Sequence, residues 1–137
     1  MAEFKVGMPG SNREDSLYLQ LGGMEFFEQL VRRFYTHVAE DPTLLALYPD
    51  PEDLAPARER LHLFLAQYFG GPSTYSERRG HPRLRMRHME FRVDPEGVQR
   101  WLAAMQKALD ELGVSGSHRT ALWDYFSMAA EAMRNAD

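Results

Sequence analysis

The stretch "YFGGPSTYSERRGHPRLRMRH", residues 68–88, joins the end of a predicted helix to a basic segment that carries two histidines. Its glycine pair and the proline that follows end any helix that precedes them. Beyond a polar loop, His81 and His88 stand among arginines at positions 79, 83, 85, 87 and 92. The whole chain is acidic, with 16 Lys+Arg against 20 Asp+Glu. The local concentration of positive charge around two histidines therefore marks this segment as a candidate binding site.

The composition of the 137 residues is that of one globular domain, with 44% hydrophobic and 12% aromatic residues. No apolar run reaches the roughly 20 residues of a membrane-spanning helix, and the first residues lack the apolar core of a secretory signal. The absence of cysteine excludes disulfides and Cys-ligated metal centres. We therefore expect a cytoplasmic protein without a membrane span. The net charge of -4 argues against general nucleic-acid binding, although the arginine cluster keeps that alternative open.

The organisation of the chain follows from its hydrophobic periodicity. Residues 1–15 mix glycine, proline, serine and charges without a period, so they are predicted to form a flexible leader before a folded domain at 16–137. Apolar residues then recur at helical spacing. The predicted helices cover residues 15–23, 25–40, 57–69, 94–113 and a last segment from 117, with a short turn at 43–48 and a loop at 73–81. The best-defined ends are those of the helix at 94–113, which has Asp94 as N-cap, Pro95 at its first position and Gly113 past its end.

The segment "RLRMRHMEF", residues 83–91, alternates basic and apolar residues and is the one candidate for a strand. A lone strand would have no partner in this chain, and Pro82 suits the first turn of a helix. We therefore predict a short helix here and an all-α domain. On such a helix, Leu84, His88 and Phe91 share one face.

The role of His88 has two readings at the level of these residues. The simpler one is a core histidine that is hydrogen-bonded to a carbonyl. A metal site built from protein alone is disfavoured, because His81 and His88 are separated by roughly 10 Å of helical rise while zinc ligands converge within about 2 Å of the ion. Haem, however, requires one axial histidine, apolar walls and cations or donors for its two propionates. The basic residues around His88 suit the propionates, and the rest of the chain must supply the other walls of such a pocket.

Three runs in the sequence resemble the truncated haemoglobins of group II. They are "RFYTHVAEDPTLLALYP" (33–49), "ERLHLFLAQYFGGPSTYSERRGHPRLRMRH" (59–88) and "QRWLAAM" (99–105), and the resemblance covers about residues 17–135. It implies a globin-like, two-over-two helical sandwich that holds haem b, the iron protoporphyrin IX. It further implies that His88 is the proximal ligand of a five-coordinate iron.

The resemblance also implies which residues face the bound group. Tyr35, Tyr48 and Trp101 match the hydrogen-bond donors on the distal side, where the ligand binds. The expected haem-binding residues are Ala57, Arg60, Leu61, Phe64, Tyr75, Arg79, His81, Met86 and Phe91, of which the two arginines, Tyr75 and His81 match the region that meets the propionates. Taken singly, Tyr35 and Trp101 would be interpreted as packing residues, and Tyr48 as the anchor of a turn before Pro49. His37 and His62 lie off the apolar stripes and are predicted to face solvent.

The function that the resemblance implies is the binding of dioxygen, carbon monoxide or nitric oxide. A hydrogen bond to a charged acceptor contributes about 1.5–3 kcal/mol in a dry pocket, so two donors would hold a ligand roughly a hundredfold more tightly, mainly through slow release. Alternatives remain open. One is a redox enzyme, either a nitric oxide dioxygenase or a peroxidase-like protein, served by a reductase. Another is a module that binds nucleic acid or a partner through its arginines, and a third is a globin whose iron has two protein ligands. Self-association into a homo-oligomer also stays open.

Overall fold

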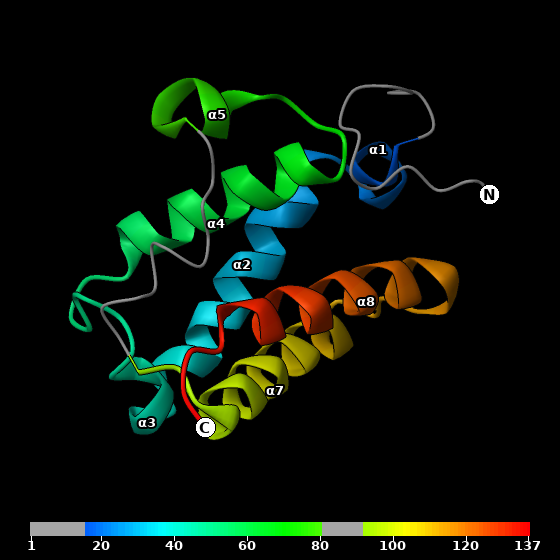
Figure 1. Ribbon diagram of the computed structural model, residues 1–137. Coiled ribbons are helices and arrows are strands. Elements are labelled where there is room, and N and C mark those ends of the chain that lie inside the picture. Colours follow the sequence, from blue (N-terminus) through cyan, green and yellow to red (C-terminus); the bar gives the residue numbers. More distant parts are fainter. Residues whose placement is uncertain (1–15, 81–91) are drawn as a thin grey trace. The chain divides into compact units, whose positions relative to one another are not determined.

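The computed structural model describes residues 16–80 and 92–137, and every regular element within these ranges is a helix. The helices are α1 (Leu17–Leu21), α2 (Met24–Ala39), α3 (Pro42–Leu45), α4 (Ala55–Tyr68), α5 (Thr74–Arg79), α7 (Pro95–Glu111) and α8 (Gly116–Met133) (Figure 1). The prediction of an all-α fold is confirmed. The predicted leader and the predicted short helix at 83–91 lie outside the described residues. None of the described helices is long and apolar enough to cross a membrane.

The ends of α7 lie where the sequence places them. The side chain of Asp94 accepts a hydrogen bond from the amide of Gly97 at 2.9 Å, and Pro95 occupies the first turn, where its missing N–H costs nothing. Gly113 follows the helix with a φ of 70°, a left-handed conformation that glycine adopts without steric cost. Local capping chemistry therefore sets both ends of this helix.

Helix α5 corrects the prediction of a loop at 73–81. Six residues are too few to display a helical period, and the helix is held instead by contacts with α4. Gln67 accepts a hydrogen bond from the amide of Ser76 at 2.9 Å and donates one to its hydroxyl at 2.7 Å. Tyr75 is buried, and its ring packs edge-on against Phe64 with centroids 5.3 Å apart. These contacts cross the turn between the two helices, so no short sequence window reveals them.

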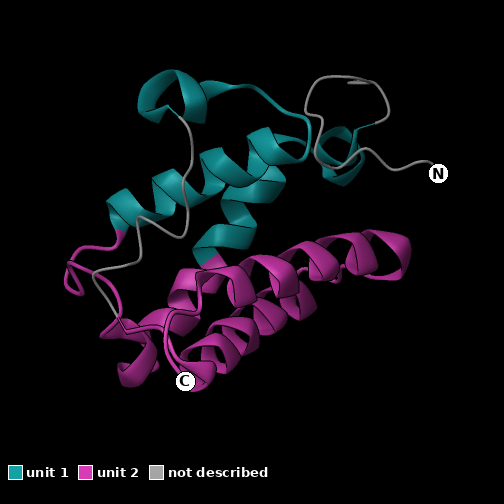
Figure 2. Ribbon diagram, viewed as in Figure 1, with its two compact units in different colours: residues 1–32, 55–82 teal, residues 33–54, 83–137 magenta. Residues whose placement is uncertain are grey.

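The chain divides into two compact units (Figure 2). Unit 1 contains residues 1–32 and 55–82, and unit 2 contains residues 33–54 and 83–137. In unit 1, Phe27 stacks on the rings of Tyr18 and Phe69, each with centroids 5.9 Å apart. Gly71 permits this packing, because a Cβ atom there would lie 2.6 Å from the ring of Tyr18.

Unit 2 is built around the pair α7 and α8, and α3 packs on α7. Its most deeply buried side chains include Leu44, Met105, Leu109 and Phe126. The carboxylate of Asp41 caps α3 by accepting from the amide of Leu44 at 3.2 Å. The same carboxylate pairs with the guanidinium of Arg100 on α7 at 3.0 Å. This arrangement ties the segment that carries Tyr48 to the helix that carries Trp101.

Candidate functional site

Three aromatic side chains that the sequence analysis singled out come together in unit 2. Tyr35 lies on α2, Tyr48 follows α3, and Trp101 lies on α7. The rings of Tyr35 and Tyr48 meet edge-on, with centroids 5.5 Å apart. The hydroxyl of Tyr48 forms hydrogen bonds with both Tyr35 and Trp101. We call these three residues the donor trio.

The direction of the hydrogen bonds within the donor trio follows from its chemistry. An indole N–H can only donate, so Trp101 donates to the hydroxyl oxygen of Tyr48. Burial of this hydroxyl raises the pKa of Tyr48 well above its ordinary value of 10.0. Repulsion from Tyr35 in its ionised form and the hydrogen bond with Tyr35 raise the pKa further, against the lowering effect of Trp101. Tyr48 therefore stays protonated even at alkaline pH, and its O–H donates a hydrogen bond to the hydroxyl oxygen of Tyr35. The three side chains thus form a chain of uncharged hydrogen-bond donors, which can stabilise a small electron-rich ligand.

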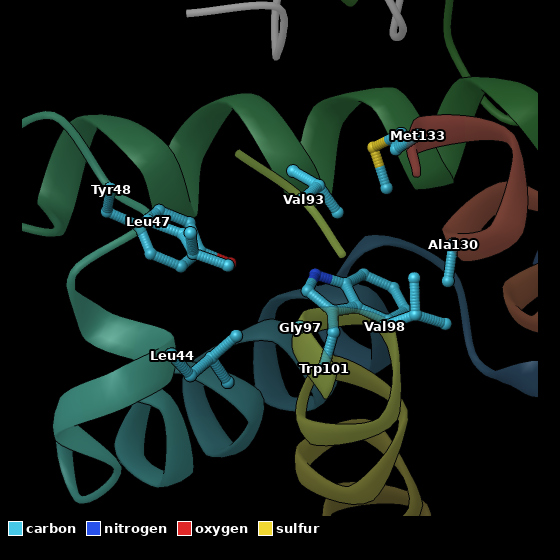
Figure 3. Close-up of a pocket in the computed structure, with 9 residues that line it drawn as sticks. All are labelled: Leu44, Leu47, Tyr48, Val93, Gly97, Val98, Trp101, Ala130 and Met133. Carbon is cyan, nitrogen blue, oxygen red and sulfur yellow. The ribbon is translucent and has the colours of Figure 1, made fainter. Parts of the chain in front are cut away.

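An apolar pocket of about 40 Å³ is lined by two members of this trio, Tyr48 and Trp101 (Figure 3). Its volume exceeds the roughly 10–15 Å³ that a single water molecule requires. Figure 3 shows the indole nitrogen of Trp101 turned toward the hydroxyl of Tyr48 at the edge of this space. The lining residues, all in unit 2, are Leu44, Leu47, Tyr48, Val93, Gly97, Val98, Trp101, Ala130 and Met133. Polar donors on an otherwise apolar wall can orient a small ligand while excluding bulk water.

The sequence did not indicate that several residues lining this pocket belong to a functional site. Val98 belongs to the apolar stripe of α7, so its burial, but not its place in a pocket, was predictable. Gly97 stands close to Leu47, and a Cβ atom there would lie 3.3 Å from the Leu47 side chain. Val93 and Met133 come from segments outside any predicted site. Only the tertiary arrangement brings these residues into one wall.

The predicted haem-binding residues of unit 1 lie on α4 and α5. Ala57, Leu61 and Phe64 follow one another at offsets of four and three, so they share a face of α4. Phe64 is buried and contacts Tyr75, whereas Ala57 and Leu61 are half-buried. Two further candidates are cationic: Arg60 is half-buried, and Arg79 is exposed at the end of α5. The candidates His81, Met86, His88 and Phe91 lie outside the described residues, so their roles stay predictions.

The prediction that His37 faces solvent is wrong. Its side chain retains only 15% exposure, and its Nε2 lies 2.7 Å from a carboxylate oxygen of Glu111 on α7. The hydrogen bond from His37 is the first cause that holds the pKa of Glu111 below its ordinary value. Periodicity along one helix indicates which side is apolar, but it cannot reveal a carboxylate supplied by another helix.

The prediction that His62 faces solvent is also wrong, because its side chain is only 17% exposed. Its Nδ1 lies 3.2 Å from the carbonyl oxygen of Arg58, one turn earlier on α4. Its Nε2 lies 3.9 Å from a carboxylate oxygen of Glu28. Both nitrogens of the ring therefore have polar neighbours within unit 1, which explains its partial burial.

Comparison with known proteins gives consistent matches over nearly the whole chain. A family model described as bacterial-like globin matches residues 16–135. The group 2 truncated haemoglobin YjbI of Bacillus subtilis is 39% identical over 113 residues, which cover 82% of this chain and 84% of that protein. Sequence similarity therefore extends from α1 to the residues that follow α8.

Solved structures agree with the sequence matches. A thermostable haemoglobin from the actinobacterium Thermobifida fusca is 54% identical and has a TM-score of 0.84, with 88% of this chain and 97% of that chain covered. A truncated oxygen-avid haemoglobin from Bacillus subtilis is 37% identical and has a TM-score of 0.83, with 88% of this chain and 100% of that chain covered. The helices described above thus follow the course of solved two-on-two globin structures.

Proposed function

The chain belongs to the bacterial-like globin family, among the group II truncated haemoglobins, and from this premise we propose that it binds diatomic ligands at haem b and releases dioxygen slowly. Haem-based binding of small diatomic ligands is the property that this family membership supports. The identity of the residues that hold the haem and retain the ligand is our proposal. The observation that carries it is the hydrogen-bonded donor trio beside an apolar pocket.

The described residues fit a haem group in their chemistry. Haem presents flat apolar faces and an edge with two propionates. Ala57 and Leu61 share one face of α4 and are apolar yet only half-buried, so this helix keeps an apolar surface that a flat hydrophobic group would cover. Arg60 and Arg79 offer guanidinium groups of the kind that bind carboxylates. In unit 2 the pocket wall around Val98 is apolar.

The proposed haem contacts in the segment 81–91 rest on the resemblance in sequence. We assign His88 as the proximal ligand, and His81, Met86 and Phe91 as further haem contacts. Ala57 has no side-chain donor, so any hydrogen bond to a ligand must come from elsewhere. Within unit 2, the donor trio offers such donors.

When bound, haem b supplies a ferrous iron that holds a diatomic ligand reversibly. The contribution of the chain is to place donors where the ligand gathers negative charge. Trp101 and Tyr48 line the pocket, and the raised pKa of Tyr48 keeps its hydroxyl protonated. Because the donors already bond with one another, a ligand gains only the difference between its own hydrogen bonds and those it replaces. The expected gain is therefore the lower end of the usual range, about 1.5 kcal/mol for each donor.

A fixed arrangement of donors reduces the cost of binding. Phe34 packs against both Trp101 and Tyr35, with centroid distances of 5.0 and 4.9 Å. The side chains therefore lose little rotational freedom when a ligand arrives. Such stabilisation is expressed mainly as slower release rather than faster capture. Slow release suits a sensor, a scavenger or a redox protein better than a carrier.

The absorption spectrum tests the haem site itself. Purified protein supplied with haemin, then reduced and exposed to carbon monoxide, is expected to show a Soret band that shifts on carbon monoxide binding. His88→Ala is expected to weaken or change this band, while His62→Ala, a change of the same kind on α4, leaves it in place. Absence of a Soret band at every stage would overturn the proposed function.

A further inference from the structure

Residues 134–137, the segment that follows α8, form several hydrogen bonds with Val93, and we call this arrangement the clasp. The proposed function does not involve it. The amide of Val93 donates to Oδ1 of Asn135 at 2.7 Å. The carbonyl oxygen of Val93 accepts from the backbone amides of Asn135 and Ala136 at 2.8 and 3.1 Å. One short segment therefore satisfies both backbone polar groups of a single residue. Arg92 adds a hydrogen bond to the carbonyl oxygen of Asp137 at 3.2 Å.

The residue held by this clasp belongs to the wall of the pocket. The side chain of Val93 is buried and lines the pocket together with Trp101 and Met133 (Figure 3). Val93 also forms a buried cluster with Val98 and Ala130, and Trp101 packs against that cluster. The hydrogen bonds of the clasp thus fix a side chain on which the indole of the donor trio rests.

We propose that Asn135 is a positioning residue of the ligand pocket. By holding Val93, it keeps the packing surface of Trp101 in place, so that the indole N–H stays aimed at Tyr48. The side-chain oxygen is the decisive atom, because it satisfies a partly buried amide that loses its partner if the oxygen is removed. The effect on haem rests on the proposed function, whereas the effect on Trp101 does not.

The test uses the full chain with Trp123→Phe as the common background, because the sequence has two tryptophans and Trp101 is then the only one. Asn135→Ala removes the acceptor, and Asn135→Asp keeps an oxygen in its place. We expect acrylamide to quench the fluorescence of Trp101 more strongly in Asn135→Ala than in the parent, both without haem. In the haem-loaded proteins we expect Asn135→Ala to lose haem to an excess of an apoglobin about fivefold faster, the factor of one ordinary hydrogen bond. Asn135→Asp is expected to restore both values toward those of the parent.

The matched control is Arg119→Met at the other end of α8. Arg119 also donates from its side chain to a backbone carbonyl, that of Val114, at 3.2 Å. Its replacement should leave both the quenching and the rate of haem loss unchanged. Equal quenching in Asn135→Ala and the parent would overturn the proposal, and so would an equal change in Arg119→Met. If the parent takes up no haem, the proposed function fails, and the quenching comparison still decides whether Asn135 positions Trp101.

Discussion

The indole N–H of Trp101 donates to the hydroxyl of Tyr48, although one residue lies on α7 and the other in the segment after α3. The two elements are joined by the pair Asp41–Arg100, and Phe34 supports the ring of Trp101 from α2. The donors are therefore oriented by the packing of unit 2 itself. This hydrogen bond leads to predictions for the titration of Tyr48 and for the rate of ligand release. The pair Asp41–Arg100 leads to a prediction for the stability of the fold.

The raised pKa of Tyr48 is directly observable. Burial disfavours its phenolate, so Tyr48 should remain protonated at alkaline pH values where exposed tyrosines ionise, near their ordinary value of 10.0. In an absorbance titration of tyrosinate, Tyr48→Phe is thus expected to leave the transition near that pH unchanged. It should instead remove amplitude from the more alkaline part of the curve. Loss of amplitude near the ordinary value would show that Tyr48 titrates like an exposed tyrosine.

Asp41 is expected to make the fold sensitive to acid. Burial raises the pKa of this carboxyl, but the amide of Leu44 and the guanidinium of Arg100 lower it by more, so it stays below its ordinary value of 3.8. A carboxyl whose pKa is lower in the folded state stabilises the fold above the unfolded-state pKa. That contribution is lost as the pH falls through the folded-state pKa. Urea unfolding at neutral pH and at steps below pH 3.8 measures the loss.

Two variants separate the roles of the Asp41 side chain. Asp41→Ala removes both the cap of α3 and the ion pair, and should lower the free energy of unfolding by about 1–2 kcal/mol at neutral pH. Asp41→Asn keeps a capping oxygen and loses only the charge, so a loss of about 1 kcal/mol or less is expected. Both should flatten the dependence of stability on acid pH. Equal losses in the two variants would contradict the assigned capping role.

The close approach of Gly71 to Tyr18 predicts a steric penalty. In Gly71→Ala the new Cβ atom would lie 2.6 Å from the Tyr18 ring and 2.8 Å from the carbonyl oxygen of Ala66, a contact with backbone that cannot swing away. We expect a loss of about 2–3 kcal/mol in the free energy of unfolding. The control is Gly113→Asn, where no atom lies within 4 Å and asparagine tolerates the positive φ. A loss in Gly71→Ala no larger than in this control would show that the turn relaxes.

How much the sequence predicted depended on the range of the interactions. The caps of α7 are local, so the sequence placed both ends of that helix correctly. Helix α5 depends on contacts with Gln67 and Phe64 across a turn, and no periodicity marks it. The pairing of His37 with Glu111 likewise joins residues that lie far apart in the chain.

The candidate site shows the same division. By spacing alone, Tyr35 and Trp101 would be interpreted as packing residues and Tyr48 as the anchor of a turn. Only their resemblance to a family pattern indicated that they act together. The hydrogen bond between Asn135 and Val93 could not be predicted, because nothing in the sequence around an asparagine that follows a helix indicates which distant residue it contacts. The proximal role of His88 is still carried by the sequence resemblance.

The rate of dioxygen release, measured by stopped flow on the reduced, haem-loaded protein, tests the role of the donor trio most directly. Tyr48→Phe and Trp101→Phe should each release dioxygen about tenfold faster than the unmodified protein, since each removes a donor that contributes about 1.5 kcal/mol. Tyr18→Phe, the same loss of a hydroxyl in unit 1, should change nothing. The account would be contradicted if the unmodified protein released dioxygen fast and neither substitution changed that rate.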